Sequence, residues 1–456
     1  MIKMSRFWSR KNKQHFSQIL QDKPSRAKAF SSQPKLLIIT QFFPPDYAAT
    51  GQLIQELADN LAKNQLEVSI FTGQPSYAYS NKQAPIREIK NNLNIRRSKT
   101  VQICSSRIRA KTINGIIFTL RSAWHILRNG RQYDTIILTT APPFLAFAGY
   151  LSNLFWGTQY ICLIYDLYPD VVVELGVVSQ NHLITKFWHY FNRIIWQKAK
   201  AIIVLSKTMK QRIIAKHSTV AHKIAVIHNW SDADWIKPLP KKDNWFACQH
   251  GIDRQFTVLY SGNMGRCHDL ETIFGAIKLL RNQPIKFVFI GAGAKYEPLQ
   301  EAVSKSQLNN CIFLPYQEKN HLPYSLTACD LALVSIAEGL EGVVAPSKLY
   351  GIMAAGKAIA AVCEPHSYLR SVVGDAQCGQ CFSNGSSVDL ADFILSLAIN
   401  PKLSVNMGNA GRRYMIDNFT PQIIARQYCQ VLDLASLEQD THVQQPDFAN
   451  EEVRVS

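Results

Sequence analysis

The sequence lacks an uninterrupted apolar segment of the length that crosses a membrane. The longest candidate runs from Pro142 to Ile164, and Asn153 and Gly157 interrupt it. A membrane-spanning helix needs about 20 consecutive, mainly apolar residues. We therefore interpret the segment as a helix over 144–155, a turn at Gly157 and a buried strand over 160–164. No secretory signal is expected, because no sustained apolar core follows the basic residues at the start of the chain.

The ten cysteines form no recognisable disulfide or metal-binding framework. Cys162 and Cys329 lie in apolar runs, which is typical of small core residues. Cys378-Gly-Gln-Cys381 is a single Cys-x-x-Cys pair, whereas a zinc site needs two further ligands at suitable spacing. Asp232-Ala-Asp234 could bind Mg²⁺ through two carboxylates, but its position in a polar linker favours ordinary turn residues. We predict no metal site and no bound cofactor, and we expect a reducing, cytosolic compartment.

Acidic residues are few, since 33 Asp and Glu against 50 Lys and Arg give a net charge of +17. The first 35 residues contain nine basic residues and one acidic residue, Asp22. This basic tail fits a solvated extension, an anionic membrane surface or an organelle transit peptide. Nucleic-acid binding would also fit the charge, but the sequence has no RNP, zinc-finger or helix-turn-helix signature, so we disfavour it.

Strands and helices alternate along the chain, and its length of 456 residues predicts two domains. Alternation of this kind is typical of α/β domains in which helices cover both faces of a parallel sheet. The apolar runs predict strands at 37–39, 68–71, 136–138, 161–164 and 202–204 in the first half. In the second half they predict strands at 258–260, 287–290, 312–314, 331–334 and 359–362.

The polar segment 228–242 contains two prolines and no periodic pattern, so it has the composition of a linker. We expect a tail, two domains, a final helix with one apolar side and a disordered polar tail. The predicted boundaries are 1–35, 36–229, 230–415, 416–436 and 437–456.

The most informative motif is EGLEGVVAPSKLYGIMAAG, which runs from Glu338 to Gly356. Gly339 and Gly342 would let the backbone approach a ligand closely. Ser347 suits the start of a helix, where unpaired amides and the charge of Lys348 would favour a diphosphate. An ordinary strand-to-helix junction is the alternative.

A second glycine turn, SGNMGR, covers Ser261–Arg266 and follows the apolar run 256–260. Two such turns at the carboxyl ends of strands in one α/β domain can converge on a single ligand. Arg266 would then supply a second cation beside Lys348, unless it is an exposed turn residue.

The two motifs resemble the retaining GT-B glycosyltransferase family, of the group 1 or family 4 type, and in particular its branch for bacterial surface polysaccharides such as O-antigen and capsule. The resemblance extends over roughly 35–434 and rests on the order and spacing of several segments. It implies two Rossmann-like, doubly wound parallel-sheet domains that face each other across a cleft, with a C-terminal helix that crosses back. The further segments are LLIITQFFPPDYAATGQLIQELADNLAKNQLEVSIFTG, YDLYPD, VIHNWSD, FIGAGAKYEPLQ and FLPYQEKNHLPYSLTACDLALVS.

The resemblance implies transfer of a hexosyl or N-acetylhexosaminyl group from a nucleoside diphosphate sugar, which we expect to be UDP-linked, to a glycan acceptor that is lipid-linked. It also implies a metal-independent reaction in which fixed cations and backbone amides stabilise the leaving diphosphate. Retention then does not require paired carboxylates, because the leaving phosphate can take the acceptor proton. The expected location is the cytoplasm, with peripheral contact at the inner face of the cytoplasmic membrane.

Four residues are predicted to be catalytic. Arg266 and Lys348 would stabilise the leaving diphosphate, Asp166 would orient or polarise the acceptor hydroxyl, and Glu341 would bind hydroxyl groups of the donor. Asp166 could instead be a loop carboxylate, and Glu341 a surface residue.

Six further residues are predicted to bind the donor. Glycines would allow the backbone to approach the phosphates and would shape the nucleotide pocket, and a glutamine would lie near the base. These residues are Gly51, Gly265, Gly291, Gly293, Gln317 and Ser347.

Three positions depart from the pattern of the family. Val343 and Gly351 stand where it commonly carries two glutamates eight positions apart, and Tyr165 stands where it usually places a histidine before the aspartate. Gly351 has no side chain to accept hydrogen bonds from ribose hydroxyls. Two other functions stay open: a nucleotide-sugar epimerase, which would need no acceptor, and a non-catalytic scaffold of a polysaccharide complex.

Basic and apolar residues intermingle between positions 107 and 131. This pattern suits a diphosphate-linked polyprenol acceptor at the membrane surface, and it equally suits a core-facing helix with a solvated basic side. The basic residues are Arg107, Arg109, Lys111, Arg121, Arg128 and Arg131.

Overall fold

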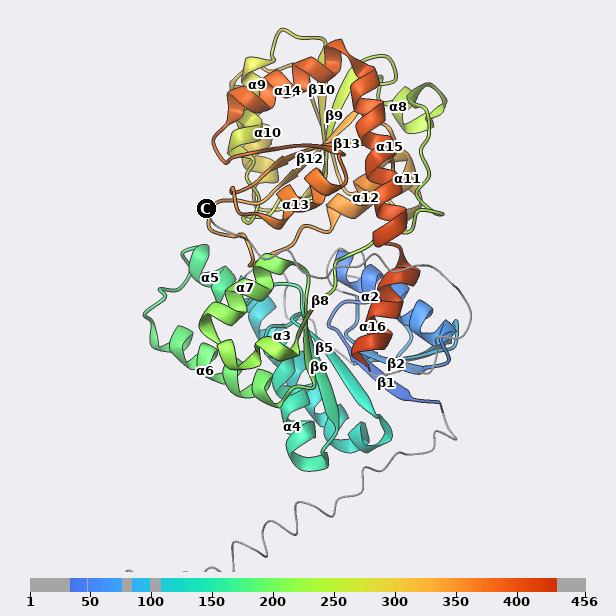
Figure 1. The fold of residues 1–456 in the computed structure, drawn as a ribbon, viewed down its shortest axis with the longest axis vertical. Coiled ribbons are helices and arrows are strands. Elements are labelled where there is room, and N and C mark those ends of the chain that lie inside the picture. The colour runs from blue at the N-terminus through green and yellow to red at the C-terminus, as the bar shows by residue number, and fades with distance from the viewer. Residues whose placement is uncertain (1–32, 47, 76–83, 99–107, 433–456) are drawn as a thin grey trace, which may run out of the picture.

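The computed structural model describes residues 33–46, 48–75, 84–98 and 108–432, with only the backbone at 108–112. Two α/β domains lie one above the other and are joined by the linker around residues 228–242 (Figure 1). Both tails and Arg107 fall outside the described residues, as do the side chains of Arg109 and Lys111.

The first domain contains an eight-stranded sheet in the order β3-β4-β2-β1-β5-β6-β7-β8. All neighbouring pairs are parallel except β3 and β4. The strands are β1 (Lys35–Ile39), β2 (Glu67–Thr72), β3 (Arg87–Lys90), β4 (Leu93–Arg97), β5 (Thr135–Thr139), β6 (Gln159–Ile164), β7 (Ala201–Val204) and β8 (Ile224–Val226).

Helices cover both faces of this sheet because successive strand residues point to opposite sides. Ile137 and Ile161 face α2 (Ala49–Lys63), whereas Ile136 and Leu138 face a second set of helices. This second set comprises α3 (Ile108–Asn129), α4 (Ala146–Trp156), α6 (Leu183–Lys198) and α7 (Lys207–Lys216). A short helix, α5 (Asp170–Glu174), follows β6, and η1 (Gly130–Gln132) and η2 (Ser218–Lys223) are 3-10 turns.

The second domain has a six-stranded, fully parallel sheet in the order β11-β10-β9-β12-β13-β14. The strands are β9 (Phe256–Asn263), β10 (Ile285–Ala292), β11 (Cys311–Leu314), β12 (Leu331–Ser335), β13 (Ala358–Val362) and β14 (Gly379–Phe382). One face packs against α9 (Glu271–Leu279), α10 (Tyr296–Lys305) and α14 (Ser387–Ile399). The other packs against α12 (Lys348–Ala354), α13 (Tyr368–Asp375) and α15 (Pro401–Asn418). The shorter elements are η3 (Lys241–Asp243), α8 (Trp245–Gln249), η4 (Lys319–His321) and α11 (Leu322–Thr327).

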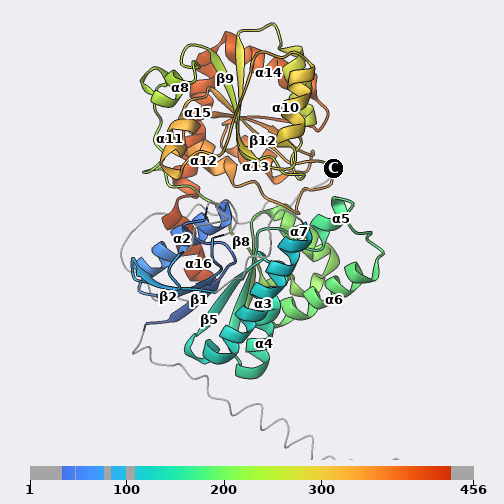
Figure 2. The same cartoon turned by 180° about the vertical axis from the view of Figure 1, so that it is seen from behind.

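The last helix, α16 (Pro421–Val431), leaves the second domain and packs beside α2 on the first (Figure 2). Ile424, Ala425 and Tyr428 are buried in the core of the first domain. The Thr420 hydroxyl caps the helix by accepting a hydrogen bond from the amide of Ile423. This crossing confirms the GT-B arrangement expected from the sequence, although α15 runs to Asn418, beyond the predicted boundary at 415.

All ten predicted strands lie within observed strands. The interrupted apolar segment forms α4, a left-handed Gly157 with φ of 67° that ends the helix, and β6, as expected. Among the residues that the structure describes, no helix is long and apolar enough to cross a membrane. The hairpin of β3 and β4 and the strands β8 and β14 were not predicted, because their sequences are short or polar.

Candidate functional site

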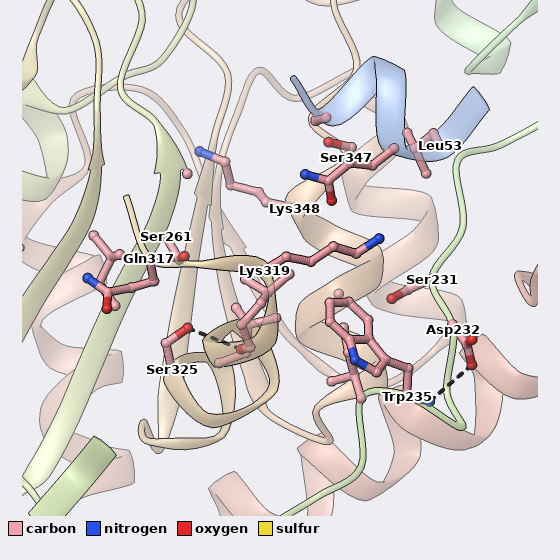
Figure 3. A pocket seen from close by; sticks show the side chains of 18 of the residues that line it. Leu53, Ser231, Asp232, Trp235, Ser261, Gln317, Lys319, Ser325, Ser347 and Lys348 are labelled. Carbon is pink, nitrogen blue, oxygen red and sulfur yellow. Dashed lines mark hydrogen bonds between the residues drawn. The ribbon is translucent and has the colours of Figure 1, made fainter. Parts of the chain in front are cut away.

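A cavity of about 240 Å³ lies between the two domains. Helix α2 contributes Gln52, Leu53 and Glu56 from the first domain (Figure 3). The linker lines one side with Trp230, Ser231, Asp232, Trp235 and Ile236. The second domain supplies the ends of its parallel strands and the start of α12, as is usual for ligand sites of open α/β sheets. Its lining residues are Ser261, Gly262, Ile290, Tyr316, Gln317, Lys319, Leu322, Ser325, Leu326, Ser347, Lys348 and Gly351.

Lys348 is the first residue of α12, and it lies in the cavity beside the end of β9. Its ammonium nitrogen is 3.8 Å from the centre of the Tyr260 ring and 3.4 Å from the carbonyl oxygen of Asn263. Burial lowers the pKa of Lys348 to about 7. The ammonium has no acidic partner among the described residues. An anion in the cavity would therefore stabilise its charged form.

Gly262 and His268 border Lys348 and were not predicted individually. Gly262 has φ of +121°, which side chains rarely allow, and a Cβ atom there would lie in ordinary contact with Cε of Lys348 at 3.6 Å, so the lysine packs beside this strand end. Nδ1 of His268 is 2.7 Å from the carbonyl oxygen of Ser335 and must therefore carry the proton that it donates. Burial, together with the charge of Lys348, lowers the pKa of His268 to about 3, so this imidazole stays neutral.

The other predicted members of the two motifs divide between the cavity and its surroundings. Ser347 and Gln317 line the cavity, and the Gln317 side chain donates to the carbonyl of Pro315 at 2.9 Å. Arg266 is exposed in the turn after β9 and does not line the cavity. Gly265 lies beside it, in a turn closed by the amide of His268 and the Gly265 carbonyl.

Gly291 and Gly293 shape the ends of β9 and β10. Both have positive φ, at +139° and +140°. A Cβ atom at Gly291 would lie 2.1 Å from the carbonyl oxygen of Gly262, and one at Gly293 would lie 2.6 Å from that of Met264. Only glycine allows these close backbone approaches, so the two residues support the turn that carries Gly262. Neither lines the cavity, and their predicted role in the nucleotide pocket stays a prediction.

Gly51 has a packing role that the sequence did not reveal. It is buried in the first turn of α2, and a Cβ atom there would lie 2.9 Å from the carbonyl carbon and oxygen of Phe42. The glycine therefore lets α2 pack tightly on the loop after β1. Its neighbours Ala49 and Gln52, rather than Gly51 itself, line the cavity.

Asp166 lies where the two domains meet. Its backbone pairs with Val344 of the second domain, and the amide of Leu167 donates to the carbonyl of Val343 at 2.9 Å. Burial raises the pKa of Asp166 to about 6. Its charge also raises the pKa of Cys267, next to Arg266, so the carboxylate lies near the glycine turn of the second domain, although Asp166 does not line the cavity.

Glu341 lies in the junction between the domains, outside the cavity. Its side chain is buried, and Oε1 accepts hydrogen bonds from the Thr208 hydroxyl at 2.5 Å and from the Tyr368 amide at 3.3 Å. Thr208 belongs to α7 of the first domain, so this contact joins the domains. Oε1 of Glu341 therefore serves the junction, whereas Oε2 is buried and has no hydrogen-bond partner among the described residues, so the predicted contact with donor hydroxyls stays a prediction.

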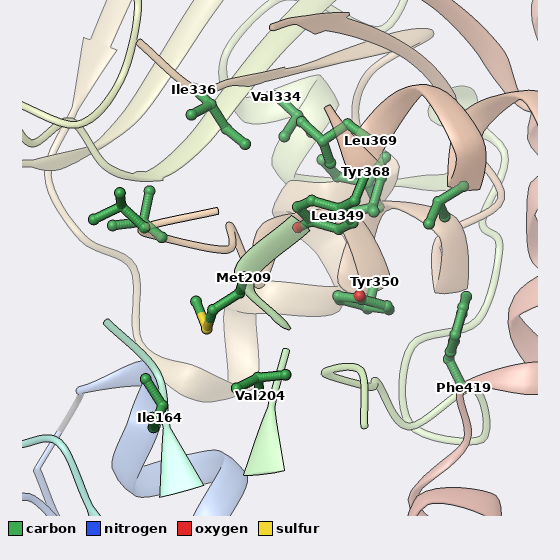
Figure 4. Close-up of a cluster of buried hydrophobic side chains, with 14 of the residues drawn as sticks. Ile164, Val204, Met209, Val334, Ile336, Leu349, Tyr350, Tyr368, Leu369 and Phe419 are labelled. Carbon is green, nitrogen blue, oxygen red and sulfur yellow. The ribbon is translucent and has the colours of Figure 1, made fainter. Parts of the chain in front are cut away.

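Arg212 reinforces the same junction. It donates to the carbonyls of Gly339 and Glu341 at 3.2 and 3.1 Å, and it pairs with Asp170 and Glu174 of its own domain. A continuous hydrophobic cluster runs behind these polar contacts, from Ile164, Val204 and Met209 of the first domain to Val334 and Leu349 of the second (Figure 4). The junction is therefore packed and hydrogen-bonded.

Two of the four glycines of the main motif, Gly339 and Gly342, lie at this junction. Gly342 has φ of +72°, and a Cβ atom there would lie 2.9 Å from the Thr208 carbonyl oxygen. Gly339 has φ of +79°, and its amide donates to Glu364. The sequence analysis expected these glycines to let the backbone approach a ligand. In the structure, the backbone at Gly342 approaches Thr208 of the opposite domain.

Two charged residues of the cavity, Lys319 and Glu56, were missed, and a third, Asp232, was expected only as a turn residue. Lys319 extends into the cavity, and its ammonium lies 5.4 Å from the centre of the Trp235 ring (Figure 3). Glu56 accepts a hydrogen bond from the Trp230 indole at 3.1 Å, and burial raises its pKa although the charge of Lys319 opposes this. Asp232 caps a turn by accepting from the amides of Asp234 and Trp235, which agrees with the turn role favoured for it.

Two family models match the chain, one for each domain. A model described as Glycosyltransferase Family 4 matches residues 50–235, and a model described as Glycosyl transferases group 1 matches residues 242–414. The first match spans most of the eight-stranded sheet, and the second spans the whole six-stranded sheet.

Two curated bacterial proteins show similarity over most of their length. A "Probable glycosyltransferase WbjE" of Pseudomonas aeruginosa is 26% identical over 292 residues, which cover 63% of this chain and 71% of that protein. A "Putative colanic acid biosynthesis glycosyl transferase WcaI" of Escherichia coli K12 is 24% identical over 340 residues, which cover 71% and 81%.

Solved structures of the same fold extend over nearly the whole chain. Sucrose-phosphate synthase from Thermosynechococcus elongatus superposes with a TM-score of 0.72 at 16% identity, covering 89% of this chain and all of that one. Anabaena Alr3699/HepE, crystallised with UDP and glucose, superposes with a TM-score of 0.67 at 14% identity, covering 88% of this chain and all of that one. These similarities establish the GT-B fold.

Proposed function

The chain carries a family 4 glycosyltransferase domain followed by a group 1 glycosyltransferase domain, and from this premise we propose that it is a retaining glycosyltransferase of surface-polysaccharide biosynthesis. The donor is a nucleoside diphosphate sugar that binds in the inter-domain cavity, and the acceptor is a lipid-linked glycan. The names of the bacterial relatives support the polysaccharide role. The UDP bound to the Anabaena protein of the same fold supports UDP as the nucleotide.

The observation that carries the proposal is the position of Lys348. Its ammonium lies in the cavity at the carboxyl ends of the parallel strands, without an acidic partner among the described residues. A cation held in a partly desolvated site is suited to a ligand with concentrated negative charge, such as a diphosphate. Because the neighbouring His268 is neutral, Lys348 is the cation of this pair of side chains.

In the proposed reaction, the bond between the anomeric carbon and the diphosphate oxygen breaks while the acceptor oxygen bonds to the same face of the sugar. The leaving phosphate takes the acceptor proton, so no protein carboxylate has to act as a nucleophile. Negative charge grows on the diphosphate, and Lys348 stabilises it most strongly at that stage. Arg266 stays a prediction for this role, because a donor would have to extend beyond the cavity to reach it.

Asp166 is the proposed acceptor-side residue. With a pKa of about 6, it is ionised at neutral pH and can accept a hydrogen bond from the acceptor hydroxyl. It belongs to the first domain, where an acceptor would lie, and its charge acts on Cys267 in the glycine turn of the second domain.

Incubation with radiolabelled UDP-sugars and a polyprenyl-diphosphate-linked glycan tests the proposal. We expect the label to move to the lipid, with the α-configuration of the donor retained in the NMR spectrum of the product, and with activity unchanged by EDTA. An interconverted free donor without lipid product would identify an epimerase. Binding without turnover for every donor and acceptor pair would contradict catalysis.

A further inference from the structure

The outer face of the first domain carries an unusual concentration of exposed apolar side chains. Helices α3, α4 and α6 cover the same side of the eight-stranded sheet and pack against each other (Figure 2). On their outer surface, six large apolar side chains each remain 60 to 65% exposed. These are Leu120 and Trp124 on α3, Leu154 and Phe155 on α4, and Phe187 and Tyr190 on α6. We call them the aromatic face.

The charge of these helices has one sign. The sequences of α3, α4 and α6 contain seven Lys or Arg residues and no Asp or Glu. Two arginines lie against the exposed indoles: the guanidinium of Arg128 is 5.5 Å from the centre of the Trp124 ring, and that of Arg131 is 3.9 Å from the Trp156 ring. Cationic and aromatic groups are therefore placed together on this surface.

We propose that the aromatic face binds an anionic lipid bilayer. Tryptophan, tyrosine and phenylalanine side chains bury their rings at the level of the lipid headgroups, and neighbouring Lys and Arg bind anionic headgroups. A second copy of this chain is a poorer occupant, since a symmetric dimer would bring together helices that carry basic residues and no acidic ones. Apolar patches on soluble surfaces are usually smaller and more scattered.

A row of stacked rings connects this face with the cleft. Phe144 stacks on Trp188 at 4.6 Å between ring centres, and Trp188 stacks on Tyr168 at 5.7 Å. Tyr168 is two residues from Asp166, the proposed acceptor-side residue. The lipid surface would therefore lie next to the acceptor side of the cleft. This placement rests on the proposed function, whereas bilayer binding itself can be measured without sugar transfer.

Co-sedimentation of the full-length protein with vesicles tests the inference. Wild type should pellet with vesicles of phosphatidylcholine and phosphatidylglycerol, and more weakly with phosphatidylcholine alone or at high salt. The triple variant Trp124→Ser, Phe155→Ser and Phe187→Ser should bind the anionic vesicles about 10-fold to 100-fold more weakly. The basic N-terminal tail is present in both proteins, so it cannot cause the difference.

The matched control is Ile399→Ser with Val405→Ser, which removes two exposed apolar side chains from the second domain. It should bind vesicles like wild type, and circular dichroism and UDP binding should show that both variants are folded. Equal vesicle binding by wild type and the triple variant would overturn the proposal, as would absence of wild-type binding. Conversion of a dimer into a monomer by the triple variant, without an effect on vesicle binding, would instead identify a second copy as the occupant. Vesicle binding by a wild-type protein that shows no sugar transfer would leave the aromatic face intact and refute only the proposed function.

Discussion

The two ends of the segment 338–356 perform different tasks, although the sequence suggests a single ligand site. At its start, Glu341 and Gly342 contact Thr208 of the opposite domain and are buried in the junction. At its end, Ser347, Lys348 and Gly351 line the cavity. Seven residues therefore separate a carboxylate with two protein partners from an ammonium without an acidic partner among the described residues.

The difference separates a carboxylate that is anchored through one oxygen from a cation that has no counter-charge among the described residues: Oε1 of Glu341 has two hydrogen-bond partners, and its Oε2 is buried with none. A buried charged group with hydrogen-bond partners contributes to the stability of the domain arrangement, and removing it is costly. A desolvated cation without a counter-charge lowers the stability of the ligand-free protein. The presence of such a cation is explained more simply by a bound anionic ligand. The comparison predicts that stability and activity respond to different substitutions along one segment.

The largest effect is expected for Lys348→Ala. Turnover should fall by about 10²–10³, because one preorganised charge at the leaving group is lost. Stability should not fall, since the lysine has no ion pair to lose. The control is Lys305→Ala on α10, where the lysine is exposed and pairs weakly with Glu301. Normal turnover by Lys348→Ala would remove it from the diphosphate site.

Glu341→Ala should lower the free energy of unfolding by about 2–4 kcal/mol, because the Thr208 hydroxyl and the Tyr368 amide lose a buried acceptor. Chemical denaturation measures the change, and Glu338→Ala, at an exposed position of the same loop, is the control. If Glu341→Ala kept its stability but lost affinity for UDP-sugar, the carboxylate would belong to the donor site as the sequence suggested.

Gly51→Ala separates packing from ligand binding in α2. The added methyl group would clash with the backbone of Phe42, and we expect a loss of about 1–3 kcal/mol in the free energy of unfolding. Gly374→Ala is the matched control, because this helical glycine has open space around it and should gain about 0.5–1 kcal/mol. An unchanged stability with weakened donor binding would restore the predicted phosphate contact of Gly51.

Much of the fold follows from local sequence patterns. Buried parallel strands are continuous apolar runs, such as 161–164 and 359–362, and a glycine at 157 ends a helix whatever the surroundings. The hairpin of β3 and β4 gave no such signal, because β3 has the sequence REIK, with exposed Arg87 and Lys90 at its ends. Its pairing depends on the neighbouring strand.

The site could be predicted only in part. Lys348 and Ser347 belong to a local motif, and the sequence identifies them as a possible anion site. Thr208, which contacts both Glu341 and Gly342, belongs to α7, more than 130 residues away, and a single sequence does not indicate such a contact. The same applies to Glu56 and Lys319, which approach each other only when α2 of the first domain and η4 of the second face the same cavity.

The most direct test of the central claim is the pH dependence of UDP binding, measured by calorimetry for wild type and Lys348→Arg. With a pKa of about 7, Lys348 is protonated below neutral pH, and bound diphosphate raises this pKa. Wild-type affinity should therefore fall above pH 7 by up to about tenfold per pH unit relative to the variant, whose arginine stays charged. The comparison cancels the protons that UDP itself exchanges. Parallel pH profiles for the two proteins would contradict the account, because the titrating cation at the diphosphate would not be Lys348.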